Sequence, residues 1–410
     1  MRKTLVATAA AAVAVLALGA GNARAVENGV PSDTFGKLDH VFLIMMENES
    51  ETDVLGNTNA PFINQYVTVA NHATDYFAVG HPSAPNYLEL NGGSNFGVNN
   101  DVWPQWVGMG CVDNNPSSGC GGAFPPIASS GLDNPVVATA MSSADCNGQI
   151  GSGGTANDCA LYNYPAAYFS PKSIADQLVA KHKSWKTYQQ GLPDIPPPGG
   201  GAPSAYGVNY SDGNFSNLSP AQVFTDAGSS GVQKLYAVKH DPFVYFQSVE
   251  VGDNPALSMA QVVDFDGPDG LWADLRSGQA PNYSFIVPDQ CHDMHSSGGG
   301  SKLCTTAADF VRQGDAEVQK LVTGIKESAA WSRGRNAIVL VWDENDYEPN
   351  QANQVVMTVE TNYAANGRTD GNAYDHYSLL KTIEAGFGLS CLNHACDTTS
   401  VVMNTMFGGS

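Results

Sequence analysis

Several apolar segments of this sequence stop abruptly at residues that titrate or bind metal. The first covers residues 41–46 and ends at Glu47 and Asn48. Such a run is typical of a strand buried on both faces of a parallel sheet, with its polar end at the rim. Three later segments repeat the pattern: 234–238 before Lys239-His240-Asp241, 283–287 before the stretch 288–295, and 337–342 before Asp343-Glu344. Because ligands bind at the carboxyl ends of parallel strands, we expect these four ends to form one polar site rather than four separate solvated caps.

Helical spacing occurs between and after these segments. Residues 307–328 carry apolar side chains at helical intervals, and their length suits the crossover of a parallel βαβ unit. Residues 170–190 show similar spacing, and residues 378–387 predict a shorter helix that Gly388 closes. Residues 355–359 are predicted as one more strand. The alternation of strands and helices predicts an α/β fold around a mainly parallel sheet.

A serine with two proline neighbours follows the first predicted strand. Ser83 lies in the sequence Gly80-His-Pro-Ser-Ala-Pro, and Pro82 and Pro85 fix the backbone on both sides. Proline also disfavours helix at the residue before it, so we expect a stiff extended loop that presents the Ser83 hydroxyl. A stiff loop suits a nucleophile. The alternative is a turn defined by proline, with no chemistry.

The first 25 residues predict export. Two basic residues, an Ala/Val/Leu run and the small-residue sequence 23–25 follow in the order of a signal peptide, with cleavage after Ala25. A membrane anchor is the alternative, but the run is short and rich in alanine. We therefore expect a secreted protein without an integral membrane segment. The whole sequence has a formal net charge of −21, and loss of three basic residues with the leader makes it −24, which disfavours nucleic acid as a partner.

Cysteine usage agrees with export. All eight cysteines follow residue 25, and an even number in an exported chain predicts disulfides. Short loops close at the least entropic cost, so we expect neighbours to pair: Cys111–Cys120, Cys146–Cys159, Cys291–Cys304 and Cys391–Cys396. Structural zinc is the competing interpretation, which the absence of any C-x₂-C pair disfavours.

Residues 26–410 are predicted as one domain with insertions. Residues 92–165 lose apolar periodicity and are rich in Gly, Asn, Ser and Cys, which indicates a loop-rich insertion stapled by disulfides. Residues 193–203 contain Pro-Pro-Pro and Gly-Gly-Gly and predict a surface connector. The sequence after this connector does not indicate a second hydrophobic core.

The strand ends and the serine offer a hard, oxygen-rich set of ligands. Oxygen donors suit a divalent cation, and a cation explains why acids crowd together. A metal at a serine hydroxyl would favour the alkoxide and neutralise phosphoryl oxygens, which indicates phosphoryl transfer assisted by Mg, Ca, Mn or Zn. The candidate ligands are Glu47, Asn48, Ser83, Asp343 and Glu344.

Other reaction classes have weaker support. A serine hydrolase with Ser83, His376 and an acid lacks the G-x-S-x-G signature. No P-loop and no H-E-x-x-H helix occur in the sequence.

Four histidines lie where they can serve this site. His295 and His240 follow predicted strands, and we favour them for binding phosphoryl oxygens or protonating a leaving group. His292 and Asp293 share the stretch with His295, while His376 begins a helix whose amino end favours an anion. A second metal, held by Asp293, His295 and His240, stays open.

Several motifs together resemble the phosphoesterase family of acid phosphatases and phospholipases C, in the alkaline phosphatase superfamily. They run in order from about Asp39 to Gly388: VFLIMMENES, GHPSAPNYLELNGG, KHDPFVYF, FIVPDQCHDMHS, VLVWDEND and DHYSLLKTIEAGFG. The resemblance implies an alkaline-phosphatase-like three-layer sandwich with helices on both faces of the sheet. It also implies a divalent metal and a covalent phosphoserine or phosphothreonine intermediate.

The resemblance also implies roles for individual residues. Glu47-Asn48 and Asp343-Glu344 match the family's two pairs of metal ligands, and Ser83 matches its nucleophile. His240 and His295 resemble the histidines that line the family's phosphate pocket, and His376 stands in its Asp-His-x-Ser-Leu-Leu segment. The residues that we expect to bind substrate are Asn86, His292, Asp293 and His376. The chain departs from the family in having Lys239 before His240 and Met294 before His295, where relatives carry Asp. These departures put the role of Asp293 in doubt.

The sequence therefore predicts a secreted acid phosphatase. Ser83 would attack phosphorus in line, a histidine would protonate the leaving oxygen, and water would hydrolyse phosphoserine, with an acidic pH favoured. The insertion shows no amphipathic lipid-binding helix, which favours small phosphate monoesters over phospholipid head groups. The alternatives are a phospholipase C type phosphodiesterase, a phosphoinositide phosphatase, and a secreted binding protein without turnover.

Overall fold

The computed structural model describes residues 35–96, 171–192, 236–250, 254–295, 304–346 and 352–409. Three predictions lie outside these residues: the signal peptide, the connector at 193–203, and the pairs Cys111–Cys120 and Cys146–Cys159. Only residues 92–96 of the predicted insertion are described. Within the described ranges, the two other predicted disulfides, Cys291–Cys304 and Cys391–Cys396, are confirmed.

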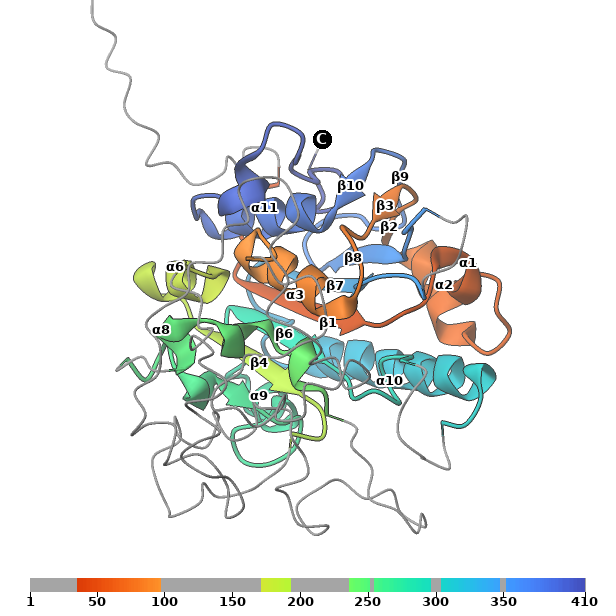
Figure 1. Cartoon of the computed structure of the whole chain (residues 1–410), viewed down its shortest axis with the longest axis horizontal. Helices are drawn as coiled ribbons and strands as arrows, with labels where there is room; N and C mark the ends of the chain where they lie inside the picture. Colours follow the sequence, from red (N-terminus) through yellow and green to blue (C-terminus); the bar gives the residue numbers. More distant parts are fainter. Residues whose placement is uncertain are drawn as a thin grey trace, which may run out of the picture.

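An eight-stranded sheet forms the centre of the molecule (Figure 1). Strand β1 (His40–Met46) lies between β6 (Tyr283–Val287) and β7 (Asn336–Trp342), and both neighbours run parallel to it. The strand order is β5-β4-β6-β1-β7-β8-β2-β9, and β8 is antiparallel to both of its neighbours. The outer strands are β4 (Trp185–Gln189), β5 (Val262–Val263), β8 (Met357–Thr361), β2 (Asn71–Ala73) and β9 (Thr369–Asp370). A second sheet pairs β3 (Tyr76–Phe77) with β10 (Tyr374–Asp375).

Helices cover both faces of the sheet, as predicted. Side chains alternate along β1, so Met46 points to one face and Glu47 to the other. Helix α10 (Ala307–Glu327) packs on the Met46 face, where Gly314 leaves no room for a Cβ beside Met46 and Met294. Helix α3 (Ser83–Gly92) lies on the Glu47 face, where its Tyr87 meets Phe285 of β6 edge to face.

The other helices extend these two layers. Helix α11 (His376–Phe387) packs beside α3, while α2 (Pro61–Val69) and α9 (Leu271–Ser277) pack against α10 (Figure 1). The remaining helical segments are α1 (Glu51–Val54), α6 (Ile174–Ala180), α8 (Gln247–Glu250), η3 (Val238–His240), η4 (Pro242–Tyr245), η5 (Met259–Gln261) and η6 (Asn393–Cys396). None of the described helices combines the length and the apolar character needed to cross a bilayer.

Two predicted elements are wrong. Residues 170–190 do not form one helix, because α6 ends at Ala180 and residues 185–189 pair with β6 as β4. The aromatic and β-branched residues of β4 suit a strand. Its partner strand lies almost a hundred residues away, and the local spacing of apolar residues does not indicate a pairing over that distance. Of the predicted strand 234–238, the described residues 236–238 form no strand, and η3 begins at Val238. Strand β4 occupies the position beside β6.

The other predicted elements are confirmed with small shifts. The predicted helix 307–328 is α10. The predicted helix 378–387 is α11, which begins at His376, and Gly388 caps its carboxyl end in the left-handed conformation. The predicted strand at 355–359 is β8, displaced by two residues. Such shifts are usual, because element ends fray and the pattern is weakest there.

Asp315 joins the two helices that cover the Met46 face. Its carboxylate accepts hydrogen bonds from the backbone nitrogens of Phe62 (3.1 Å) and Ile63 (2.8 Å), in the first turn of α2. These nitrogens have no partner within their own helix, so a side chain from α10 caps α2 from outside. We predict that Asp315→Ala lowers the free energy of unfolding by about 2 kcal/mol. Urea unfolding measures the loss.

The exposed Asp266 offers a matched control, and Asp266→Ala should change stability by less than about 0.5 kcal/mol. Asp315→Asn should lie between wild type and Asp315→Ala, since an amide oxygen accepts one of the two bonds without the charge. Equal stability of the Asp315→Ala and Asp266→Ala proteins would contradict this account of the cap.

Candidate active site

Glu47 and Asn48 leave the end of β1 on the face that carries α3. Glu47 is completely buried, and its backbone nitrogen donates to the carbonyl of Asp293 (2.8 Å), which joins the ends of β1 and β6. Asn48 has a φ of +53°, in the left-handed region that asparagine tolerates better than most residues. This turn directs the chain away from the sheet immediately after Glu47. The end of β1 is therefore open to groups from neighbouring segments.

Ser83 is the first residue of α3. It is 1% exposed, and its Oγ donates to Glu47 Oε2 (3.0 Å) or to Glu344 Oε1 (3.2 Å). The predicted extended loop is wrong, because Pro85 lies in the first helical turn. Proline is tolerated there, since the backbone nitrogens of the first turn have no partner within the helix. The serine hydroxyl thus lies at a helix amino terminus, which favours negative charge.

Asn86 fixes the loop that leads into Ser83. Its Oδ1 accepts from the backbone nitrogens of Val79 and Gly80 (both 3.1 Å), and its Nδ2 donates to the carbonyls of Gly80 (2.9 Å) and Pro82 (3.2 Å). The side chain is buried and used on both ends. Its contacts thus hold the loop in place, and the predicted role in substrate binding stays a prediction.

Asp343 and Glu344 follow β7 and meet the end of β1. Asp343 Oδ1 accepts from the backbone nitrogens of Asn48 (3.1 Å) and Glu344 (2.7 Å). Glu344 contacts Ser83 through Oε1 and His81 Nδ1 through Oε2. The structure therefore brings together all five predicted metal ligands.

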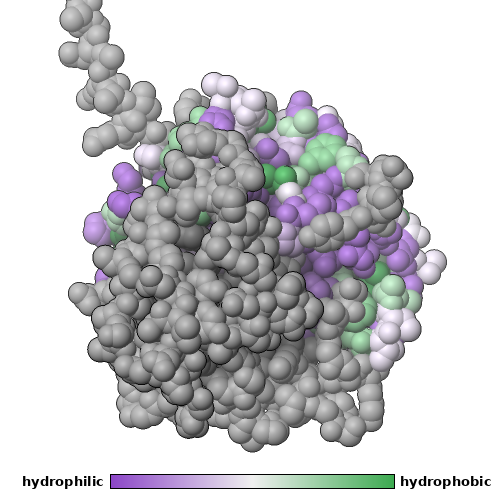
Figure 2. Space-filling view, viewed as in Figure 1, coloured by the Kyte–Doolittle hydropathy of each residue, from purple (hydrophilic) through white to green (hydrophobic). Residues whose placement is uncertain are grey.

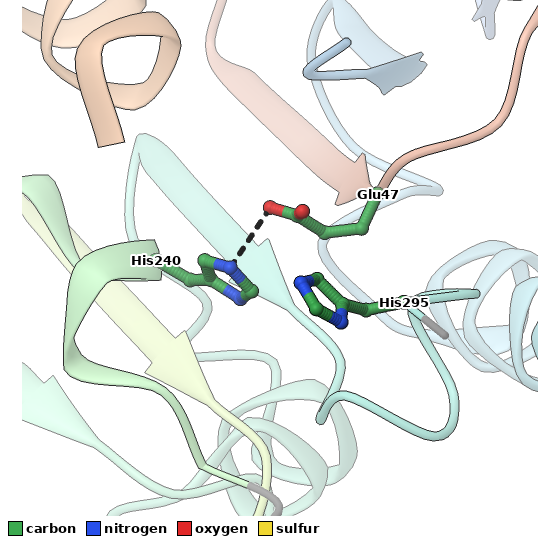
Figure 3. Close-up of side chains that lie close together, drawn as sticks. All are labelled: Glu47, His240 and His295. Atoms are coloured by element: carbon green, nitrogen blue, oxygen red, sulfur yellow. Dashed lines mark ion pairs between the residues drawn. The ribbon is translucent and has the colours of Figure 1, made fainter. Parts of the chain in front are cut away.

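His240 and His295 complete the cluster around Glu47 (Figure 3). His240 Nε2 lies 3.1 Å from Glu47 Oε1, and His240 Nδ1 lies 3.5 Å from Asp293 Oδ2. The ring of His240 stacks on Tyr87 with the two planes 4° apart, while the ring centroids of His240 and His295 are 5.8 Å apart. Burial lowers the pKa of His240, and the nearby Lys239 and His295 lower it further. The contacts with Glu47, Asp293 and Tyr87 therefore hold the ring of His240 at both nitrogens and on one face.

The carboxyl groups of this cluster are crowded. Burial raises the pKa of Asp343, and the charges of Glu47 and Glu344 raise it further. Burial and Glu47 likewise raise the pKa of Asp293, although the backbone nitrogen of His295 donates to its carboxylate (2.7 Å). A cation among these groups would relieve the repulsion.

The residues fit a metal ion. Among the described residues, Asn48 Oδ1 and Asp343 Oδ2 are buried atoms without a hydrogen-bond partner, and oxygens of this kind suit a divalent cation. Glu47, His240 and His295 each offer one ligand atom, and these atoms lie within 4.8 Å of one another. Nitrogen donors also suit zinc and other transition metals. Groups that can hold a metal are thus present on both sides of Glu47.

His376 lies behind the cluster and not within it. Its Nε2 is 2.7 Å from the carbonyl oxygen of Asp343, and its Nδ1 is 2.8 Å from the hydroxyl of Tyr76. Burial lowers its pKa to about 4, so the neutral ring donates to the carbonyl and accepts from Tyr76. These contacts position Asp343 from behind, and the predicted contact of His376 with substrate stays a prediction.

His292 points to a different group. Its Nδ1 lies 2.8 Å from Asp289 Oδ1, in a cluster with Cys291. Cys291 is bonded to Cys304, so its sulfur is not available as a thiolate. Among the contacts that the structure describes, His292 has none with Ser83 or Glu47. Its predicted role in substrate binding therefore stays a prediction.

The sequence analysis did not single out three residues that the structure places at the site: His81, Tyr87 and Lys239. His81 contacts Glu344, Tyr87 stacks on His240, and Lys239 Nζ lies 3.5 Å from Ser83 Oγ. His81 and Tyr87 lie within four residues of Ser83, which is the one signal that the sequence offered. Lys239 carried two signals, namely its position next to His240 and the replacement of the Asp that relatives have there.

The site is separate from a surface cavity of about 960 Å³ between α9 and α10. That cavity is lined by Trp272, Lys320 and other side chains of the two helices, and none of its lining residues belongs to the cluster. Figure 2 shows hydrophilic residues gathered between the positions of α3 and α2, over the ends of the central strands. The buried carboxyl and imidazole groups lie at the polar edge of the sheet and not in this cavity.

Protonation of His376 is expected to destabilise the fold in acid. Its pKa is about 4 in the folded protein against an ordinary value of 6.5, so the folded state binds this proton less readily than the unfolded chain. The stability from neutral His376 is present above pH 6.5 and is lost as the pH falls toward 4. At about 1.4 kcal/mol per pKa unit, the loss approaches about 3 kcal/mol. Urea unfolding at pH 7 and pH 4.5 measures it.

His376→Asn isolates this effect from other titrating groups. The variant should be less stable than wild type at pH 7, and the gap should shrink by about 2 to 3 kcal/mol at pH 4.5. His182→Asn, at an exposed histidine, should follow wild type at both pH values. A gap of the same size at pH 7 and pH 4.5 would show that His376 does not titrate on unfolding.

Comparison with known proteins places these residues in a family. A family model described as Phosphoesterase family matches residues 57–390. A phosphatidylinositol-3-phosphatase of Mycobacterium tuberculosis is 23% identical over 376 residues, which cover 91% of this chain and 85% of the relative. A phosphate-repressible acid phosphatase of Penicillium chrysogenum is 24% identical over 321 residues, which cover 78% of this chain and 52% of the relative. The chain thus spans about half the length of this fungal relative.

Solved structures with a similar course of the chain are more distant. A protein in the alkaline phosphatase superfamily from Vibrio parahaemolyticus has a TM-score of 0.43 and 11% identity, and the alignment covers 90% of this chain and 72% of that one. The lipoteichoic acid synthase LtaP from Listeria monocytogenes has a TM-score of 0.42 and 12% identity, covering 92% of this chain and 78% of that one.

Proposed function

We propose that this chain, which belongs to the Phosphoesterase family and is a phosphoric ester hydrolase, is a secreted, metal-dependent acid phosphatase that uses Ser83 as its nucleophile. The observation that carries the proposal is the position of Ser83 Oγ, which lies at the amino end of α3 and within 3.2 Å of two buried carboxylates. A helix amino terminus attracts a phosphoryl group, and a carboxylate can accept the serine proton.

The two sides of Glu47 divide the metal ligands. Asn48, Ser83, Asp343 and Glu344 would hold a cation together with Glu47. A second cation at Glu47, His240 and His295 would occupy a nitrogen of His295, so the proton transfer from His295 applies to the site with one cation. A bound divalent cation supplies positive charge that lowers the pKa of the serine hydroxyl and neutralises phosphoryl oxygens. The oxygen ligands suit Mg, Ca or Mn, and the imidazole ligands suit Zn.

The chain's own residues account for the proton transfers. Ser83 Oγ gives its proton to Glu47 or Glu344 and forms a bond to phosphorus as the bond to the leaving oxygen breaks. The leaving oxygen takes a proton from His295, which is half-buried, whereas His240 is 1% exposed and fixed on two sides. Water then gives a proton to the now neutral His295 and bonds to phosphorus as the bond to Oγ breaks. Ser83 Oγ recovers its proton from Glu47 or Glu344, and phosphate is released. Protonated His295 requires acidic pH.

The Mycobacterium relative favours a second candidate substrate. It is named a phosphatidylinositol-3-phosphatase and aligns over 85% of its length, so a phosphoinositide monoester is a specific alternative to small soluble monoesters. A phospholipase C type diesterase and a secreted binding protein without turnover are the further alternatives. The presence of Ser83 and of both acidic pairs supports turnover.

Secretion is supported by two observations. The first 25 residues have the order of a signal peptide. The described residues hold two disulfides, Cys291–Cys304 and Cys391–Cys396, and such bonds persist in oxidising compartments.

Ser83→Ala is expected to lower the turnover of p-nitrophenyl phosphate at least about 1000-fold, because it removes the hydroxyl that forms the proposed covalent intermediate. Thermal unfolding and metal content should stay close to wild type. Ser332→Ala is the matched control and should keep full activity, because this exposed serine precedes the amino end of β7, whereas the acids of the cluster follow its carboxyl end. Near-native turnover by the Ser83→Ala protein would remove Ser83 from the reaction.

Metal removal tests the oxygen-rich site. Chelation should abolish turnover of p-nitrophenyl phosphate, bis-p-nitrophenyl phosphate and phosphatidylinositol 3-phosphate alike, and it should lower the midpoint of thermal unfolding because the carboxylates of the cluster then repel. Adding back Mg, Ca, Mn or Zn one at a time identifies the ion. Full activity after chelation, with metal analysis showing less than one ion per ten chains, would contradict a role for metal.

The same three substrates, with phosphatidylcholine added, separate the candidate functions. Preference for the first indicates a soluble monoesterase, and preference for the phosphoinositide indicates the second candidate. Cleavage of the diester or of phosphatidylcholine indicates a phosphodiesterase. Absence of turnover on all four, in protein that contains metal, would favour the binding protein.

A further inference from the structure

Lys239 is a cation that the proposed reaction does not yet use. It lies in η3, between Val238 and His240, and its Nζ donates to Ser83 Oγ at 3.5 Å. The side chain is half-buried, so it is partly shielded from solvent but accessible to a ligand. Lys239 thus places a positive charge beside the candidate nucleophile of a strongly acidic protein.

The backbone that carries Lys239 is held firmly. The His240 nitrogen donates to the carbonyl of Ala237 (3.0 Å), and Gln189 Nε2 donates to the carbonyl of His240 (3.3 Å). The next residue, Asp241, caps η4 through the nitrogen of Phe243 (3.3 Å). The ring of His240 is clamped by Glu47 and Tyr87. Lys239 therefore reaches Ser83 from a fixed anchor, and a shift of the ammonium requires only side-chain rotation.

The ammonium of Lys239 lies among the charged groups of the site. Its Nζ is 3.5 Å from Ser83 Oγ, and this Oγ is within 3.2 Å of two buried carboxylates. A phosphate that enters the same space meets this positive charge as well.

An incoming phosphate needs such a charge. The buried carboxyl groups of Glu47, Asp343 and Glu344 surround Ser83 and would repel a phosphate monoester, which carries close to two negative charges near pH 7. A phosphate diester carries one. The benefit from a fixed cation at Ser83 is therefore larger for the monoester.

We propose that Lys239 binds a phosphoryl oxygen of the substrate beside Ser83 and thereby makes the site prefer phosphate monoesters over diesters. When phosphorus is bonded to Oγ, its three other oxygens surround the position that the Lys239 ammonium already approaches. The ammonium then donates a charge-assisted hydrogen bond to one of them and gives up its contact with Oγ. This inference rests on the proposed function of Ser83, and it adds a substrate-binding residue and a basis for specificity.

Lys239→Met tests the role of the charge, because methionine keeps most of the length and the flexibility of lysine. We expect kcat/KM for p-nitrophenyl phosphate to fall about 10- to 100-fold, the loss typical for one charge-assisted hydrogen bond. For bis-p-nitrophenyl phosphate the fall should be less than about threefold. Lys239→Arg, which keeps the charge, should recover most of the monoester activity. Lys326→Met is the matched control and should behave as wild type, because Lys326 lies on α10 and pairs with Glu360 of β8.

Phosphate binding gives a second readout that needs no turnover. Inorganic phosphate should bind the metal-loaded Ser83→Ala protein, measured by calorimetry, about 10- to 100-fold more tightly than it binds Ser83→Ala/Lys239→Met. Equal phosphate affinity in the two proteins would overturn the inference, even if Ser83→Ala is inactive as proposed. An active Ser83→Ala protein would instead overturn the nucleophile, and the calorimetric comparison would still decide whether Lys239 binds phosphate.

A purely structural role for Lys239 predicts a different result. Loss of packing would lower kcat/KM for monoester and diester by the same factor and would also lower the midpoint of thermal unfolding. Equal losses on the two substrates would therefore contradict the inference. If Lys239→Met does not fold, Lys239→Gln provides the neutral side chain for the same comparisons.

Discussion

The arrangement of the site depends on four buried carboxyl groups at one edge of the sheet. Glu47, Asp293, Asp343 and Glu344 have almost no exposed surface, and each of the two aspartates has its pKa raised by burial and by a neighbouring acid. Carboxylates in such a place require protons or cations, because unpaired buried charge is costly. The neighbouring histidines can share protons with these carboxylates, and Lys239 provides a positive charge. The oxygen atoms of the cluster can also bind a metal cation. Stability and substrate binding therefore depend on the same balance of charge.

The parallel sheet is what brings these groups together. With β1 between β6 and β7, the three carboxyl ends lie at one edge, and the alternation along β1 turns Glu47 toward α3 while Met46 packs against α10. Helix α3 then needs only to begin at this edge for Ser83 to meet Glu47 and Glu344. The same geometry places a helix amino terminus opposite the acids, so the site combines positive and negative potential over a few ångströms.

The parts of the fold that could be predicted from the sequence are those whose signal is local. Strands β1 and β7 are long apolar runs with an acid at the end, and α10 has a strong period. Strand β4 was missed because Trp185 to Gln189 fits either period, and its pairing with β6 depends on contacts distant in sequence. For the same reason the sequence grouped the acids of the site correctly but did not indicate that His376 supports Asp343 through its backbone carbonyl.

The two histidines of the cluster differ in what surrounds them, and this difference assigns their work in the proposed reaction. His240 is stacked on Tyr87 and contacts carboxylates through both nitrogens, so its ring is held in one orientation. His295 approaches the same Glu47 from the other strand end and retains exposed surface. A group that exchanges protons with a leaving oxygen must meet both substrate and solvent. The difference in burial therefore favours His295 over His240 as the proton donor of the proposed reaction.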